Sequence, residues 1–205
     1  MGLTNAQLTA GLDAVAARDP QVARALEAVG YPEERIRETG YRTLLRTIVG
    51  QQVSVAAANA VWGRLVAQLG EDIPPRALLD ADFDALRACG LSRQKQGYAR
   101  SLCALIDDGA LDLHALPADD EEAIAALTQV KGIGRWSAEI YLLFAEGRPD
   151  IWPAGDLAVQ VGAGRIAGME ERPDERATRA LAEKWRPHRG AMAIFTWHYY
   201  QNPAL

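Results

Sequence analysis

Apolar residues recur at intervals of three and four along almost the whole chain, and this helical period is the strongest constraint on its fold. No segment alternates apolar and polar residues between hairpin turns, as a half-buried strand does. Outside the motifs below, the pattern predicts helices over 3–17, 20–29, 76–89, 92–106, 174–185 and 188–201. Gly30 should end the second helix and Pro32 open a further turn, while the stretch 41–69 should break near Gly50. We therefore predict an all-α fold.

Composition places the chain among compact globular domains. Its 205 residues are 49% hydrophobic and 24% charged, which excludes collagen-like and disordered chains. Cys89 and Cys103 lie inside apolar helical patterns, as buried free thiols do. No basic leader precedes an apolar run, and no uncharged apolar stretch of about 18 residues occurs. We expect a cytoplasmic protein that does not insert into membranes.

The distribution of charge is uneven. A net charge of −5 argues against a nucleic-acid partner, because phosphate neutralisation needs basic surface. Segments 39–70 and 85–106, however, contain Arg and Lys with no acid, whereas 107–122 contains seven acids with no Lys or Arg. This segregation predicts one basic face and one separate acidic face.

Gly132 and Gly134 stand two positions apart between a helix expected up to Leu127, capped by Asp119 or Asp120, and a helix expected over 135–145. Glycines at a helix start leave backbone N–H groups uncovered, and such groups suit a phosphate. An isolated Gly-x-Gly more often makes a plain turn between packed helices. The hairpin over 128–136 is therefore a candidate phosphate site.

Asp156 follows the loop 146–155, which is rich in proline and glycine, and opens a helix expected to run through Ile166. A carboxylate in this place is ordinarily a helix N-cap. N–H donors at a helix start also favour the ionised carboxylate, which makes Asp156 a candidate catalytic group.

Four short strings give the sequence a more specific likeness: 48–54, Gly90-Leu91-Ser92 with Lys95, 132–136 and 185–189. In this order they resemble the signatures of the 3-methyladenine DNA glycosylase II (AlkA-type) branch of the helix-hairpin-helix (HhH-GPD) superfamily. The resemblance spans about 41–200. It implies one domain over 1–205 with two helical lobes, about 41–149 and about 1–40 plus 150–205, and an active-site cleft between them. The chain looks like the compact form, without the β-rich N-terminal domain of some members.

The resemblance also assigns roles to residues. Asp156 matches the catalytic aspartate, and the base pocket would be lined by Trp136, His188, Ile140 and Leu157. Contacts to double-stranded DNA would come from Gly132, Gly134, Lys131, Gln51, Gln52, Ser92 and Lys95, with Gln52 entering the gap left by the flipped base. Backbone carbonyls of Thr128, Val130 and Ile133 would hold a structural Na⁺ or K⁺. The family likeness implies no catalytic cofactor, and we expect a monomer.

Trp136 separates this chain from the bifunctional relatives. In the endonuclease III branch the matching residue is a lysine that forms a Schiff base with the sugar, and an indole has no amine for this step. Those relatives often carry a four-cysteine iron–sulfur loop, whereas this chain has two cysteines, both upstream of the hairpin. A monofunctional enzyme without an iron–sulfur cluster is expected.

The expected reaction is excision of an alkylated purine after base flipping. Such a base already carries positive charge and leaves without a general acid, so Asp156 would stabilise the sugar cation or also deprotonate the water. The sequence leaves both roles open. Three other readings also stay open: a bifunctional glycosylase/lyase for oxidised bases, a non-catalytic DNA-binding hairpin module, and a helical protein–protein module.

Overall fold

The computed structural model describes residues 2–202, and within that range all regular structure is helical. The predicted all-α fold is therefore confirmed. The chain forms two compact units, Met1–Arg37 with Leu142–Leu205 and Glu38–Tyr141, and each is described by itself. Among residues 2–202, no helix is both long enough and apolar enough to cross a membrane.

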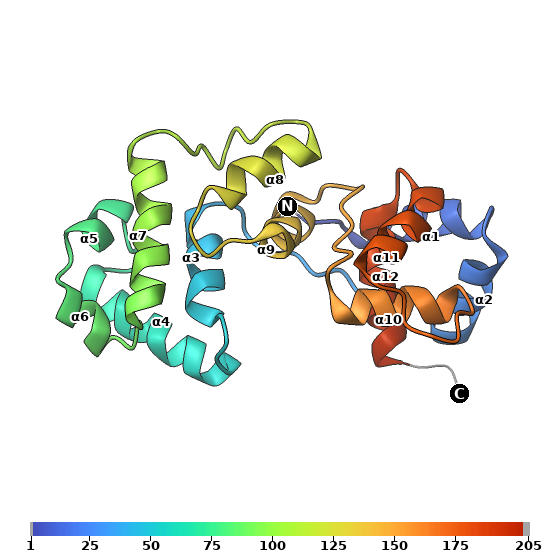
Figure 1. Ribbon diagram of the computed structural model, residues 1–205, viewed down its shortest axis with the longest axis horizontal. Helices are drawn as coiled ribbons and strands as arrows, with labels where there is room; N and C mark the ends of the chain where they lie inside the picture. The colour runs from blue at the N-terminus through green and yellow to red at the C-terminus, as the bar shows by residue number, and fades with distance from the viewer. Residues whose placement is uncertain (1, 203–205) are drawn as a thin grey trace. The chain divides into compact units, whose positions relative to one another are not determined.

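The unit Glu38–Tyr141 is a helical bundle built around α3. Its helices are α3 (Tyr41–Gly50), α4 (Val55–Leu69), α5 (Pro75–Asp80), α6 (Phe83–Ala88), α7 (Arg93–Asp107), α8 (Asp120–Thr128) and α9 (Arg135–Tyr141) (Figure 1). Leu44, Leu45 and Ile48 of α3 are fully buried, and α3 packs against α4, α7 and α9. The predicted break near Gly50 is confirmed, and Ser92 caps α7 where the helix over 92–106 was predicted to begin.

The single helix predicted over 76–89 is wrong. Two short helices, α5 and α6, replace it, because Asp82 caps α6 by accepting the Asp84 amide at 2.9 Å. The guanidinium of Arg100 donates to the carbonyls of Leu79 and Ala81 beside the break. These side chains satisfy backbone groups that a continuous helix would have paired internally.

The other unit is centred on α12. Its helical segments are α1 (Asn5–Ala16), α2 (Pro20–Val29), the π-helical turn η1 (Leu142–Glu146), α10 (Leu157–Ile166), α11 (Glu175–Leu181), the 3₁₀ turn η2 (Ala182–Trp185) and α12 (Arg189–Gln201) (Figure 1). Residues 190–197 of α12 are buried, and α10 makes its closest packing against this helix. A Cβ on Gly162 would lie 2.4 Å from the carbonyl oxygen of Thr196, so glycine allows the two backbones to approach.

One further expectation is wrong, and two other predicted helices change type in their last turn. Residues 30–39 form no helical turn after Pro32, because their backbone bonds elsewhere: Glu34 N–H donates to Asn5 and Arg37 N–H to the carbonyl of Phe144. The helix expected over 135–145 is α-helical only to Tyr141 and continues as η1. The helix expected over 174–185 likewise ends as the 3₁₀ turn η2.

Gly162 and Gly63 provide a matched test of the α10–α12 contact. Gly162→Ala should destabilise the fold by about 1–3 kcal/mol, because the new methyl overlaps backbone of α12. Gly63→Ala, in a helix with nothing within 4 Å of the new Cβ, should stabilise by about 0.4–1 kcal/mol. Chemical denaturation of both variants measures the difference, and equal effects would contradict the described packing.

Candidate functional site

The predicted hairpin joins α8 to α9 through a turn that leaves two amides unused. Ile133 N–H closes the turn on the carbonyl of Val130 at 3.0 Å. Within residues 2–202, the amides of Gly132 and Gly134 donate no hydrogen bond. Unpaired N–H groups at the start of a helix are the donors that an anion requires.

The two glycines meet different requirements. Gly132 has φ +84°, and a Cβ there would lie 2.2 Å from the ring of Tyr98, so both conformation and space within the protein demand glycine. A Cβ on Gly134 would meet nothing within 4 Å. The space beside the Gly134 amide is therefore open to a ligand.

Neighbouring helices hold the turn in position. Gln51, at the end of α3, donates its side-chain amide to the carbonyl of Gly132 at 2.8 Å. Ser101 of α7 accepts the Lys131 amide at 3.1 Å. The strings 48–54 and 132–136 therefore meet in one site.

Carbonyl oxygens of the hairpin fit the expected alkali-metal site in part. Within residues 2–202, the carbonyls of Thr128 and Ile133 accept no hydrogen bond, whereas that of Val130 accepts the Ile133 amide. Oxygen atoms of this kind are the ligands that hard cations prefer.

Asp156 lies in the other unit as the N-cap of α10. Its Oδ1 accepts the amides of Ala158 at 2.9 Å and Val159 at 3.0 Å. The indole N–H of Trp197, on α12, donates to the same oxygen at 3.0 Å. Three donors from two helices therefore orient a half-buried carboxylate.

Trp197 is a site residue that the sequence analysis did not identify. The residue is 8% exposed and belongs to the core, but its N–H also binds the candidate catalytic carboxylate. The ring packs against Phe144 of η1 with centroids 5.5 Å apart. A buried indole N–H needs an acceptor, and this requirement was the one available signal.

The loop before Asp156 is fixed by side chains. Gln160 donates to the carbonyl of Ala154 at 2.8 Å and accepts from Arg172 at 2.6 Å. Trp152 donates its indole N–H to the carbonyl of Thr178 at 3.1 Å. These side-chain hydrogen bonds therefore fix the conformation of the loop that leads to Asp156.

The four predicted base-pocket residues differ in exposure. Trp136 is 46% exposed and Leu157, next to Asp156, is 59% exposed. Ile140 is buried and presents little surface. The ring of His188, the residue before α12, lies against Gly11 of α1.

The other predicted DNA contacts also differ. Gln52 is exposed at φ +54°, an unusual conformation for a residue other than glycine. The Ser92 hydroxyl caps α7 by accepting the amide of Lys95. The Lys95 ammonium donates to the carbonyl of Val49 at 2.7 Å, and burial lowers the pKa of Lys95. The side chain of Lys131 is exposed.

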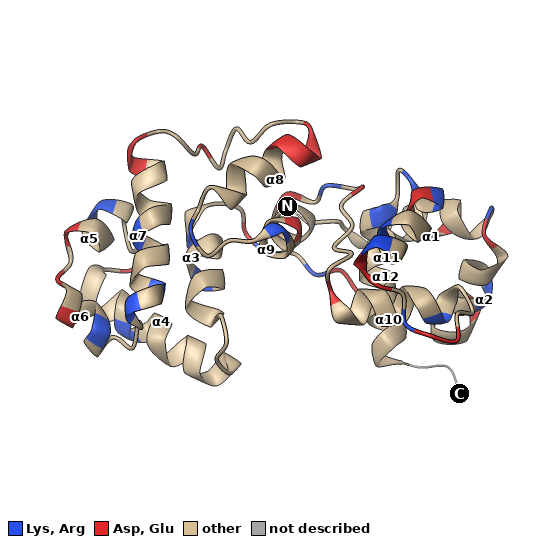
Figure 2. Cartoon of the chain, viewed as in Figure 1, with Lys and Arg blue, Asp and Glu red and all other residues tan. Residues whose placement is uncertain are grey.

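The acidic segment 107–122 is connected to the hairpin. Glu121, in the first turn of α8, forms an ion pair with Arg135, the first residue of α9. Figure 2 shows the acidic residues at the start of α8. Asp119 caps α8. Acidic side chains therefore take part in building the hairpin.

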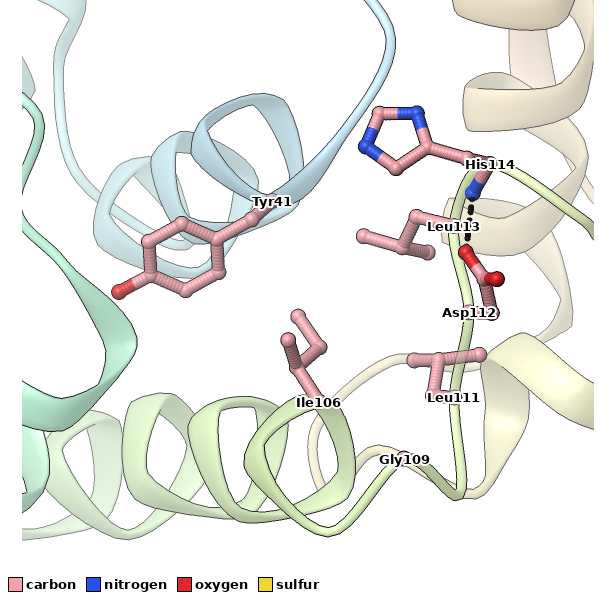
Figure 3. Close-up of a pocket in the computed structure, with 7 residues that line it drawn as sticks. All are labelled: Tyr41, Ile106, Gly109, Leu111, Asp112, Leu113 and His114. Atoms are coloured by element: carbon pink, nitrogen blue, oxygen red, sulfur yellow. Dashed lines mark hydrogen bonds between the residues drawn. The ribbon is translucent and has the colours of Figure 1, made fainter.

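A cavity of about 300 Å³ lies elsewhere in the unit Glu38–Tyr141 (Figure 3). Aliphatic side chains surround it, with the Tyr41 ring at one wall and His114 and Asp112 on the loop after α7. None of its lining residues is a predicted site residue. The neighbouring Cys103 is a free thiol whose pKa is raised by burial to about 11, as expected for a buried structural cysteine.

A helical hairpin with two unused amides, followed by a multiply bonded aspartate at a helix start, is the arrangement of a helix-hairpin-helix base-excision protein. Residues 45–188 match the HhH-GPD superfamily of base excision DNA repair proteins, and the chain belongs to this superfamily.

Particular relatives agree with this assignment. DNA-3-methyladenine glycosylase 1 of Schizosaccharomyces pombe is 33% identical over 161 residues, which cover 77% of this chain and 71% of the relative. A DNA-3-methyladenine glycosidase from Bacillus halodurans is structurally similar, with a TM-score of 0.86 and 29% identity over 93% of this chain and 88% of that one. The S. pombe 3-methyladenine DNA glycosylase Mag1 in complex with abasic DNA gives 0.79 and 30% identity, covering 95% and 98%.

Gly132→Ala and Gly134→Ala should separate folding from DNA binding. The first should destabilise the protein by about 1–3 kcal/mol, because it forces a methyl into Tyr98 at positive φ. The second should change stability by less than about 0.5 kcal/mol, yet weaken binding to duplex DNA with an abasic analogue about tenfold. Thermal unfolding and fluorescence anisotropy measure the two effects. Full affinity in Gly134→Ala would exclude a phosphate from this amide.

Proposed function

We propose that this chain is a monofunctional DNA glycosylase that hydrolyses the N-glycosidic bond of alkylated purines, with 3-methyladenine as the principal base and 7-methylguanine as a further one. The observation that carries this proposal is the Asp156 carboxylate, which accepts three N–H groups at a helix start. The names of the similar proteins support the choice of substrate.

Double-stranded DNA is the partner, bound by one copy of the protein. The Gly132 and Gly134 amides grip one backbone phosphate, which requires no particular base sequence. Gln52 enters the duplex in place of the flipped nucleotide, and its exposed position on a turn tied to the hairpin by Gln51 supports this role. Base flipping costs a few kcal/mol, less at a damaged pair.

The chemistry breaks the bond between C1′ of the sugar and a purine nitrogen. The bonding electron pair leaves with the base, which is already cationic and therefore departs neutral. The sugar becomes an oxocarbenium-like cation, and a water oxygen then bonds to C1′ while its proton passes to a second solvent water. Asp156 stabilises the cation electrostatically, since its donors fix the position of its negative charge before the reaction.

Trp136 and Leu157 supply apolar surface for the extruded base. An electron-poor alkylated purine stacks well on an indole, and the exposure of Trp136 leaves its ring accessible. Leu157 is aliphatic and adjacent to Asp156.

A Na⁺ or K⁺ ion at the hairpin fits the carbonyls of Thr128 and Ile133, with that of Val130 as a third ligand. Such an ion would supply positive charge beside the phosphate. The residues of the chain need no cofactor for the hydrolysis itself.

Asp156→Asn tests the catalytic role. Asparagine also caps helices, so stability should change by less than about 1 kcal/mol. Excision of 3-methyladenine from methylated DNA should fall about 10²-fold or more, because the negative charge is lost. Release of free base and binding to abasic-analogue DNA are measured together. Excision within threefold of wild type would remove Asp156 from the mechanism.

Trp197→Phe tests the positioning of that carboxylate. The ring remains but the N–H donor is lost, so excision should fall about tenfold while DNA affinity is kept. Trp185→Phe is the matched control, because it removes a similar indole–carboxylate bond, to Asp19, in the same unit. Equal activity of the two variants would mean that the Trp197 bond has no catalytic role.

The product should be an intact abasic strand, since Trp136 provides no amine for a Schiff base. Strand breaks should appear only after alkali treatment of the DNA. Borohydride reduction during turnover should trap no covalent protein–DNA adduct. An adduct in good yield would instead indicate a bifunctional lyase acting through another amine, of which Lys131 is the hairpin candidate.

A further inference from the structure

Arg135 occupies a place in the hairpin that the functions above do not use. It is the first residue of α9 and directly follows Gly134. Its Nε donates to Glu139, one turn further along α9, at 3.0 Å. Its Nη1 and Nη2 donate to the two carboxylate oxygens of Glu121, in the first turn of α8. One guanidinium therefore bridges both helices of the hairpin.

The two carboxylates differ in environment. The side chain of Glu139 is 3% exposed, whereas that of Glu121 is 68% exposed. A buried charge is costly without a partner, so Glu139 anchors the guanidinium on α9. The bidentate pair with Glu121 then fixes the direction of α8, because two parallel N–H···O bonds restrict orientation. The carboxylates also raise the pKa of Arg135 above its ordinary value.

The amides of Gly132 and Gly134 lie on the turn between these helices. Gln51, Tyr98 and Ser101 contact the turn from α3 and α7. The Arg135 bridge instead joins α8 to α9, and so controls the angle at which the turn is held between them. Donors aimed at one phosphate lose their geometry when this angle changes.

We propose that Arg135 is a positioning residue of the phosphate-binding hairpin, which locks α8 against α9 through Glu121 and Glu139 and makes no DNA contact of its own. The proposal rests on the DNA-binding role given to this hairpin under Proposed function. The three side chains together carry a net charge of −1, which favours a structural bridge over a phosphate contact.

Arg135→Lys separates positioning from charge. Lysine keeps the positive charge and can still pair with Glu139, so no buried carboxylate is left alone. A compact ammonium cannot place donors on three oxygens of two helices at once, as the planar guanidinium does. Glu121→Gln removes the other end of the bridge and also leaves the Arg135–Glu139 pair intact.

The experiment measures affinity for duplex DNA with an abasic analogue over a range of salt concentrations, beside thermal unfolding. For Arg135→Lys we expect about tenfold weaker binding at each salt concentration and an unchanged log–log salt slope, because the hairpin amides that lose their geometry carry no net charge and the variant keeps the charge of residue 135. Glu121→Gln should weaken binding in the same direction, although it removes a negative charge. The matched control is Arg76→Lys, because Arg76 also bridges two carboxylates, Asp80 and Asp107, in the same unit.

Different results of these measurements would contradict different parts of the proposal. Wild-type affinity in Arg135→Lys would overturn the positioning role in a protein that still binds DNA, and with reduced thermal stability it would leave Arg135 a structural residue only. Tighter binding by Glu121→Gln would also overturn the positioning role. Failure of the wild-type protein to bind the duplex would overturn the proposed function and this inference together.

Discussion

The Oδ1 atom of Asp156 is the point on which the geometry of its unit depends. Two amides at the start of α10 and the indole of Trp197 on α12 share this one acceptor. Trp197 packs on Phe144, and the carbonyl of Phe144 accepts the amide of Arg37 at 2.8 Å. The cap of α10 and the candidate catalytic carboxylate are thus one group, since the donors at the start of the helix also orient the carboxylate. The position of this carboxylate is therefore fixed by the packing of α10 against α12.

The string Trp185–Arg189 is one of the four that resemble family signatures, and its side chains make structural hydrogen bonds. Trp185 is fully buried, and its indole donates to Asp19. Asp150 accepts from the guanidinium groups of Arg186 and Arg189, with distances of 2.6–2.9 Å. These bonds join the start of α12 to the loop 146–155 that leads to Asp156. The side chains of this string therefore stabilise the loop that precedes the Asp156 carboxylate.

Local patterns predicted most of the helices and the positions of the two functional motifs. The bounds of α2, Pro20–Val29, agree with the prediction because Asp19 caps the helix and Gly30 ends it. Contacts between distant segments were not predictable, because no local pattern encodes them. Trp197 lies 41 positions from Asp156, and the ammonium of Lys95 lies against a carbonyl 46 positions away. The hydrogen bonds from Arg135 to Glu121 were missed for the same reason, since Glu121 lies 14 positions before Arg135.

The net charge of −5 is the main physical objection to a DNA-binding protein, and the structure answers it through backbone chemistry. Most cations of the acid-free segments are used inside their unit: Arg46 stacks on Trp62, Lys95 binds the Val49 carbonyl, and Arg100 holds carbonyls between α5 and α6. Amides of a hairpin carry dipoles but no net charge, so their attraction for a phosphate does not depend on the charge of the chain. Their interaction is short-ranged, in contrast to the long-range attraction of a basic face. An acidic protein can therefore bind a DNA phosphate through the amides of one hairpin, while the rest of its surface adds little non-specific affinity.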